Sequence, residues 1–89
     1  MATRSLEIIN EKGLHARASA KLVETVEGFD AQAQIYRDGQ SAAGDSIMGL
    51  LMLAASRGTT IEVETTGPEA DALADAIAAL VADRFGEGM

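Results

Sequence analysis

The chain has 89 residues, of which 47% are hydrophobic, and its formal net charge at pH 7 is −7. This length suits one modest hydrophobic core, so we expect a single domain over residues 1–89. The acidic balance argues against nucleic acids and anionic membrane surfaces as partners. Cysteine is absent and histidine occurs once, which excludes disulfides and disfavours a zinc site. We expect neither a metal nor a cofactor.

The N-terminus has no apolar run preceded by basic residues, so we expect no signal peptide. No apolar stretch is long enough to span a bilayer. These two features predict a cytoplasmic protein without membrane insertion. Its small size and high negative charge favour a monomer.

Alternating and helical hydrophobic patterns follow one another along the chain in the order β-α-β-β-α-β-α. The first strand alternates around Leu6 and Ile8, and a polar loop over 10–13 follows it. The first helix stops at Gly28, a residue typical of helix ends. The expected strands are 4–10, 31–37, 40–43 and 59–66, and the expected helices are 16–27, 47–54 and 67–84.

Two turns and the tail complete this prediction. Asp38-Gly39 predicts a type I′ hairpin between the second and third strands. Pro68 is suited to the first turn of the last helix, and residues 86–89 are expected to fray. Four strands with three helices on one face make a two-layer α/β sandwich.

The stretch Gly13-Leu14-His15-Ala16-Arg17 places the single histidine where the first helix begins. The first N–H groups of a helix lack partners within it and carry partial positive charge, which favours an anion. Arg17 adds a charge suited to phosphate. We therefore predict reversible phosphorylation of His15, with Arg17 and the backbone N–H groups of Ala16 and Arg17 stabilising the phosphoryl group. A plain capping or surface role for His15 remains the alternative.

A second candidate site begins at Ser46, which is expected to cap the short helix that follows it. Capping alone explains this serine, although a phosphate on it would also be stabilised at a helix start. Leu50 and Leu53 can face the sheet. The other apolar positions form either a docking surface for partners or part of the core: Ile47, Met48 and Leu51.

The motifs Gly13-Leu14-His15-Ala16-Arg17 and Ser46-Ile47-Met48-Gly49, in this element order, closely resemble the HPr family. These are phosphocarrier proteins of the bacterial phosphoenolpyruvate-dependent phosphotransferase system. The resemblance covers nearly the whole chain. It implies an open-faced sandwich in which three helices cover a four-stranded antiparallel sheet.

The same resemblance implies roles for particular residues. His15 would accept phosphate on Nδ1 from phosphorylated Enzyme I and pass it to a histidine of an EIIA-type protein or domain. The protein would thus be a carrier rather than a stand-alone enzyme. Arg17 matches the active-site arginine, and Ser46 matches a regulatory serine that HPr kinase/phosphorylase modifies in many relatives. The implied docking residues are Lys21, Ile47, Met48 and Leu51.

Two departures from the family pattern affect these expectations. Ala18 stands where many members have proline, which frees the first turn of the helix. Asp45 stands where many have lysine, and its charge would repel a phosphate on Ser46. The Ala-Ser version of the motif also resembles the nitrogen-branch paralogue, NPr. The alternative function is therefore a regulatory binding protein that acts through the Ser46 helix, including a nitrogen-branch role without sugar transport.

Overall fold

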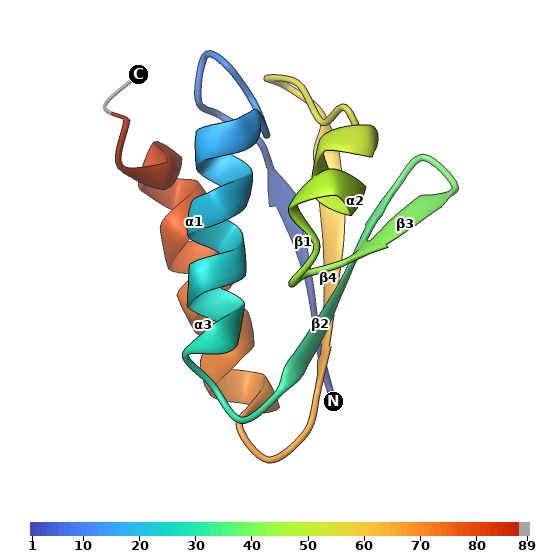
Figure 1. The fold of residues 1–89 in the computed structure, drawn as a ribbon, viewed down its shortest axis with the longest axis vertical. Coiled ribbons are helices and arrows are strands. Elements are labelled where there is room, and N and C mark those ends of the chain that lie inside the picture. The colour runs from blue at the N-terminus through green and yellow to red at the C-terminus, as the bar shows by residue number, and fades with distance from the viewer. Residues whose placement is uncertain (88–89) are drawn as a thin grey trace.

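A computed structural model describes residues 1–87, and it contains one four-stranded sheet covered on one face by helices (Figure 1). The element order and the antiparallel pairing confirm the predicted sandwich. The strands are β1 (Ala2–Glu7), β2 (Gln32–Arg37), β3 (Gln40–Ala43) and β4 (Thr60–Thr66). The helices are α1 (Ala16–Glu27), α2 (Ile47–Met52) and α3 (Ala70–Ala82), and a 3₁₀ turn, η1 (Arg84–Gly86), follows them.

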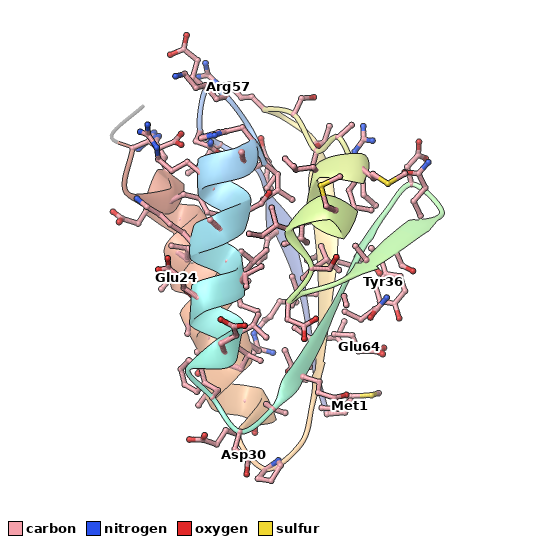
Figure 2. The ribbon with its side chains drawn as sticks, viewed as in Figure 1. Met1, Glu24, Asp30, Tyr36, Arg57 and Glu64 are labelled. Carbon is pink, nitrogen blue, oxygen red and sulfur yellow. The ribbon has the colours of Figure 1, made fainter. Side chains whose placement is uncertain are left out.

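The sheet order is β1-β4-β2-β3, so β4 lies inside the sheet between β1 and β2. Ile61 and Val63 of β4 are buried against the helices, whereas Glu62 is exposed on the open face, as the alternation predicts. The hairpin between β2 and β3 is also as predicted, because Asp38 and Gly39 both have positive φ, at 52° and 82°. Side chains such as Tyr36 and Glu64 project from this part of the sheet (Figure 2).

The first strand differs from the prediction, since β1 spans Ala2–Glu7 rather than residues 4–10. Its early residues pair with β4, beginning at Ala2 opposite Thr65. These residues lack apolar alternation, so the pattern gave no signal for them. Ile8 continues the pairing beyond the strand, because its N–H donates to the Thr59 carbonyl at 2.9 Å and its carbonyl accepts from Gly58 N–H at 2.8 Å.

The end of the chain differs more. The last helix stops at Ala82 and not at Arg84, because Arg84 and Phe85 both adopt φ of 53°. The chain turns there, and the Phe85 side chain enters the core with no exposed surface. The predicted fraying is therefore wrong for Gly86 and Glu87, while residues 88–89 lie outside the described part of the chain. Among residues 1–87, no helix has the length and hydrophobicity needed to cross a bilayer.

Candidate functional site

His15 is the N-cap of α1, in extended backbone geometry with φ of −82° and ψ of −175°. Its ring atom Nδ1 accepts a hydrogen bond from the Arg17 N–H at 3.2 Å. An acceptor at this position must carry a lone pair, so Nδ1 bears no proton in this arrangement. The Arg17 N–H, which we expected to be free for phosphate, is thus already directed at the atom that would carry the phosphoryl group.

The loop before α1 fixes the position of His15 through Gly13, whose φ is +66°. Next to it, the Leu14 N–H donates to the Ala55 carbonyl at 2.8 Å, which ties the loop to the segment after α2. On the other side, the buried Asn10 donates its Nδ2 to the Gly13 carbonyl at 2.8 Å. The start of α1 is therefore held from two directions.

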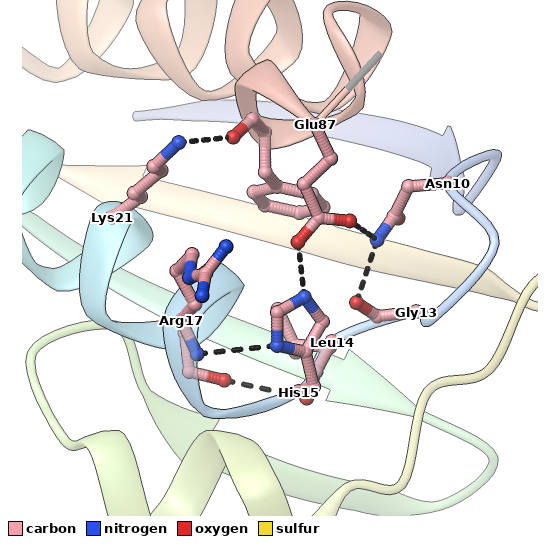
Figure 3. A network of polar contacts seen from close by, with 9 residues as sticks. Asn10, Gly13, Leu14, His15, Arg17, Lys21 and Glu87 are labelled. Carbon is pink, nitrogen blue, oxygen red and sulfur yellow. Dashed lines mark hydrogen bonds and ion pairs between the residues drawn. The ribbon is translucent and has the colours of Figure 1, made fainter. Parts of the chain in front are cut away.

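The other ring nitrogen of His15 contacts a residue that the sequence analysis missed. Nε2 pairs with Oε2 of Glu87, which lies 72 positions later in the chain (Figure 3). The second carboxylate oxygen of Glu87 accepts from Asn10 Nδ2 at 3.0 Å. Because the Asn10 amide faces a carbonyl and a carboxylate, both of its N–H groups must point toward them. No local sequence signal marks Glu87, since its role depends on how the chain turns after α3.

The surroundings of Glu87 favour its charged form. Partial burial alone would raise its pKa, but three neighbours oppose that effect: the Asn10 hydrogen bond, the His15 contact and the charge of Lys12. Together they lower the pKa of Glu87 below its usual value of 4.5. The site therefore holds a carboxylate against the histidine ring at neutral pH.

This shift predicts a pH-dependent contribution to stability. A carboxyl group with a lowered pKa in the folded state stabilises the fold above its unfolded-state pKa, and that stabilisation is lost as pH falls through the folded-state pKa. Glu87→Gln should therefore lower the free energy of unfolding at pH 7 but have less effect at pH 3. Urea unfolding of both proteins at both pH values tests this, and an equal difference at the two pH values would contradict it.

Basic side chains gather in a pocket of about 230 Å³ that adjoins the site. Its lining residues are Glu11, Lys12, Arg17, Lys21, Gly86 and Glu87. The Lys21 ammonium also donates to the Phe85 carbonyl at 2.6 Å, so it ties α1 to η1. Lys21 and Arg17 therefore lie on the same side of α1 as Glu87 and add positive charge beside His15.

The second predicted site is built as a capped helix. Ser46 Oγ accepts from the Gly49 N–H at 3.1 Å, and Leu50 and Leu53 are buried, as expected. α2 packs beside α1. The hydrogen bond from the Leu14 N–H to the Ala55 carbonyl connects the segment that follows α2 to the His15 loop. The exposed fractions of the large apolar residues on α2 are 40% for Ile47, 70% for Met48 and 76% for Met52. The sequence analysis overlooked Met52, and Leu51 is half-buried.

Removing this cap should have a measurable but limited effect. Ser46→Ala loses the acceptor for the Gly49 N–H, so the free energy of unfolding should fall by about 1 kcal/mol. Ser46→Asp keeps an acceptor at the same place and should retain most of the stability. Chemical denaturation of the three proteins checks this, and equal stabilities would show that the cap is energetically unimportant.

Comparison with known proteins decides the family. A family model described as the PTS HPr component phosphorylation site matches residues 2–83. The chain belongs to the HPr family. It is 49% identical to the phosphocarrier protein HPr of Cupriavidus necator over 88 residues, and this alignment covers 99% of both chains. It is also 41% identical over 85 residues, or 94% of both chains, to the phosphocarrier protein NPr of Escherichia coli.

The fold agrees with this membership. The crystal structure of HPr-C-His from Thermoanaerobacter tengcongensis superposes with a TM-score of 0.95, at 31% identity and with full coverage of both chains. The resemblance drawn from the two short motifs is thus confirmed at the level of family, fold and phosphocarrier function. The family model matches residues 2–83, so Glu87 lies beyond the matched residues.

Proposed function

We propose that this protein carries a phosphoryl group on Nδ1 of His15. It receives the group from phosphorylated Enzyme I and passes it to an EIIA-type protein or domain of the phosphotransferase system. The observation that carries the proposal is the hydrogen bond from Arg17 N–H to Nδ1, at 3.2 Å. It directs the lone pair of Nδ1 to the positive end of α1, where an incoming anion is stabilised.

The chemistry follows from this placement. The Nδ1 lone pair forms a bond to phosphorus, and the bond from phosphorus to the donor breaks, leaving its electron pair on the donor. Once Nδ1 has used its lone pair, the Arg17 N–H can donate to a phosphoryl oxygen instead. The Arg17 side chain lines the adjoining pocket, and its positive charge stabilises the negative phosphoryl oxygens.

The proposal is tested by intact-protein mass after incubation with phosphoenolpyruvate and Enzyme I. The natural protein should gain one phosphate that mild acid removes, and His15→Ala should gain none. Ser46→Ala serves as the matched control and should gain phosphate normally. No gain in the natural protein, with Enzyme I proven active on another carrier, would overturn the proposal.

Arg17 should matter for rate more than for stability, because its side chain is exposed beside the site. Removing a preorganised group that stabilises developing charge typically costs about 100-fold in rate. We expect Arg17→Ala to slow phosphoryl gain by about that factor, while Arg57→Ala, an exposed arginine in another loop, leaves it unchanged. Rapid-quench measurements of the phosphorylated fraction decide this, and equal rates for the two variants would exclude a role for the Arg17 side chain.

A docking role for α2 is the second part of the proposal. Ile47, Met48 and Met52 form an exposed apolar surface on α2, which packs beside α1, and Leu51 of the same helix is half-buried. The ammonium of Lys21, the other predicted docking residue, is instead bonded to the Phe85 carbonyl of η1. We propose that Enzyme I and EIIA-type partners contact this surface. We extend the proposal to regulation at Ser46 by an HPr kinase/phosphorylase, because a phosphate on this N-cap residue would lie at the start of α2, while the charge of Asp45 would oppose it.

The regulatory alternative makes a different prediction about the same surface. A protein that acts only through α2 would bind its partners equally well after His15→Ala. The choice between sugar transport and a nitrogen-branch role depends on which EIIA-type protein accepts the phosphate. The monomeric state and the cytoplasmic location expected from size, charge and sequence remain parts of this proposal.

A further inference from the structure

Glu87 is largely shielded from solvent and is held in place by contacts on both carboxylate oxygens. Its side chain is 12% exposed, and both carboxylate oxygens are engaged, Oε1 by Asn10 and Oε2 by His15. The turn that delivers it is fixed on both sides, because Phe85 is fully buried and its carbonyl accepts from Lys21. This arrangement brings a carboxylate to the ring nitrogen opposite the helix start (Figure 3).

The two contacts of the His15 ring select the same tautomer. A charged carboxylate can only accept hydrogen bonds, so its partner Nε2 must carry the proton. The Arg17 N–H can only donate, so its partner Nδ1 must carry the lone pair. A histidine whose second nitrogen donates to a carboxylate is held in one orientation and one tautomer, as is found beside metal ions and in catalytic triads.

We propose that Glu87, held by Asn10, is a positioning residue for His15: it keeps the proton on Nε2 and opposes the positive charge that the ring acquires on phosphorylation. This inference rests on the proposed function of His15 as the phosphoryl acceptor. It adds to that function a residue outside the segment that the family model matches.

The charge balance of the reaction shows why a carboxylate is useful there. Before transfer the ring is neutral, with a proton on Nε2 and a lone pair on Nδ1. When Nδ1 bonds to phosphorus, the donor keeps the electron pair of the broken bond and the ring becomes a cation that still holds its Nε2 proton. Glu87 stabilises this cation without taking the proton. When the phosphoryl group leaves, the electron pair returns to Nδ1 and the ring is neutral again.

The position of the carboxylate also limits its repulsion of the phosphoryl group. Glu87 meets Nε2, whereas the phosphoryl group would sit on Nδ1, across the ring. Three cationic side chains line the pocket shared with Glu87, namely Lys12, Arg17 and Lys21. The carboxylate is therefore placed to act on the ring, and these basic groups add positive charge close to it.

The first test is spectroscopic and needs no phosphate. Because the chain has one histidine, long-range proton–nitrogen NMR spectra report the ring nitrogens of His15 without ambiguity. We expect one protonated Nε2 and one unprotonated Nδ1 in the natural protein at neutral pH. Glu87→Ala should move both nitrogen shifts part of the way toward averaged values, because one of the two contacts that select the tautomer is lost and the Arg17 N–H contact remains. Glu24→Gln, an exposed change on α1 with the same loss of charge, should keep the natural pattern.

The second test is the rate of phosphoryl gain from phosphorylated Enzyme I. Loss of a group that orients a functional histidine typically costs about 10–100-fold, and we expect about 10-fold for Glu87→Ala. Glu87→Gln retains an acceptor oxygen but no charge. A rate between those of the natural protein and Glu87→Ala would support both roles of Glu87, which are to orient the ring and to stabilise its positive charge. A rate equal to that of the natural protein would contradict the stabilisation of charge and leave the orientation of the ring supported.

Two results would overturn the inference altogether. One is a natural tautomer pattern in Glu87→Ala. The other is a rate for Glu87→Ala equal to or faster than that of Glu24→Gln, because a faster rate would mean that the carboxylate obstructs transfer. Failure of the natural protein to gain phosphate would instead contradict the proposed function, and the NMR result would stand apart from it.

Discussion

Gly13→Ala should lower the free energy of unfolding by about 2–5 kcal/mol and impair phosphoryl transfer as well. Gly13 has φ of +66°, where an alanine costs about 1–2 kcal/mol. Its added Cβ would lie 2.5 Å from the Ala55 carbonyl oxygen and 2.8 Å from Ser56 Cα, which are backbone atoms with little freedom to move. Such overpacking adds about 1–3 kcal/mol.

The functional consequence follows from the same contact. Relief of the clash must separate the His15 loop from residues 55–56, to which Leu14 is hydrogen-bonded at 2.8 Å. The His15 ring would then shift relative to both Arg17 and Glu87, so the phosphorylation rate should fall even in the folded fraction.

Gly39→Ala is the matched control for this prediction. Gly39 also has positive φ, at 82°, but its added Cβ would meet nothing within 4 Å. Gly39→Ala should lower the free energy of unfolding only by the backbone strain, about 1–2 kcal/mol, and should leave the phosphorylation rate unchanged. Urea unfolding and phosphorylation rates of both variants measure the difference. Equal losses of stability would show that the contact with residues 55–56 is not restrictive.

Phe85→Ala should lower the free energy of unfolding by about 3–5 kcal/mol, the range typical of a fully buried phenylalanine. This is a large share of the 5–15 kcal/mol that usually stabilises a domain. The same change should release η1 from the core and weaken the contact of Glu87 with His15. We therefore expect the nitrogen shifts of His15 to move toward averaged values in this variant too, at temperatures where it remains folded.

The control is Tyr36→Ala, which removes a ring that is 38% exposed on β2. Tyr36→Ala should lower the free energy of unfolding by much less than Phe85→Ala and leave the nitrogen shifts of the His15 ring unchanged. Thermal and urea unfolding compare the two variants. A Phe85→Ala loss no larger than that of Tyr36→Ala would mean that the end of the chain does not pack as the structure shows.

The parts of the site that the sequence predicted are those specified by neighbouring residues. Gly13, His15 and the helical pattern from Ala16 lie together in the chain, so their capping geometry could be inferred from local rules. Ser46 with the Gly49 N–H, and the Asp38-Gly39 turn, were predictable for the same reason.

The parts that the sequence did not predict depend on distant segments. Glu87 follows Gly86 in a tail that looked suited to fraying, and nothing nearby indicates that Phe85 fills the core. The sequence predicts Asn10 in a polar loop, and the structure shows it fully buried, with its side-chain amide donating to Gly13 and Glu87. The sheet order likewise reflects which strands meet in space and has no local signature.

The central claim is that the phosphoryl group sits on Nδ1 of His15, at the start of α1. The most direct measurement is the phosphorus–nitrogen coupling in NMR spectra of the nitrogen-15-labelled, phosphorylated protein. We predict coupling to Nδ1, the nitrogen that accepts from Arg17 N–H. Coupling to Nε2, the nitrogen held by Glu87, or a phosphate found on Ser46 and not on His15, would contradict the account.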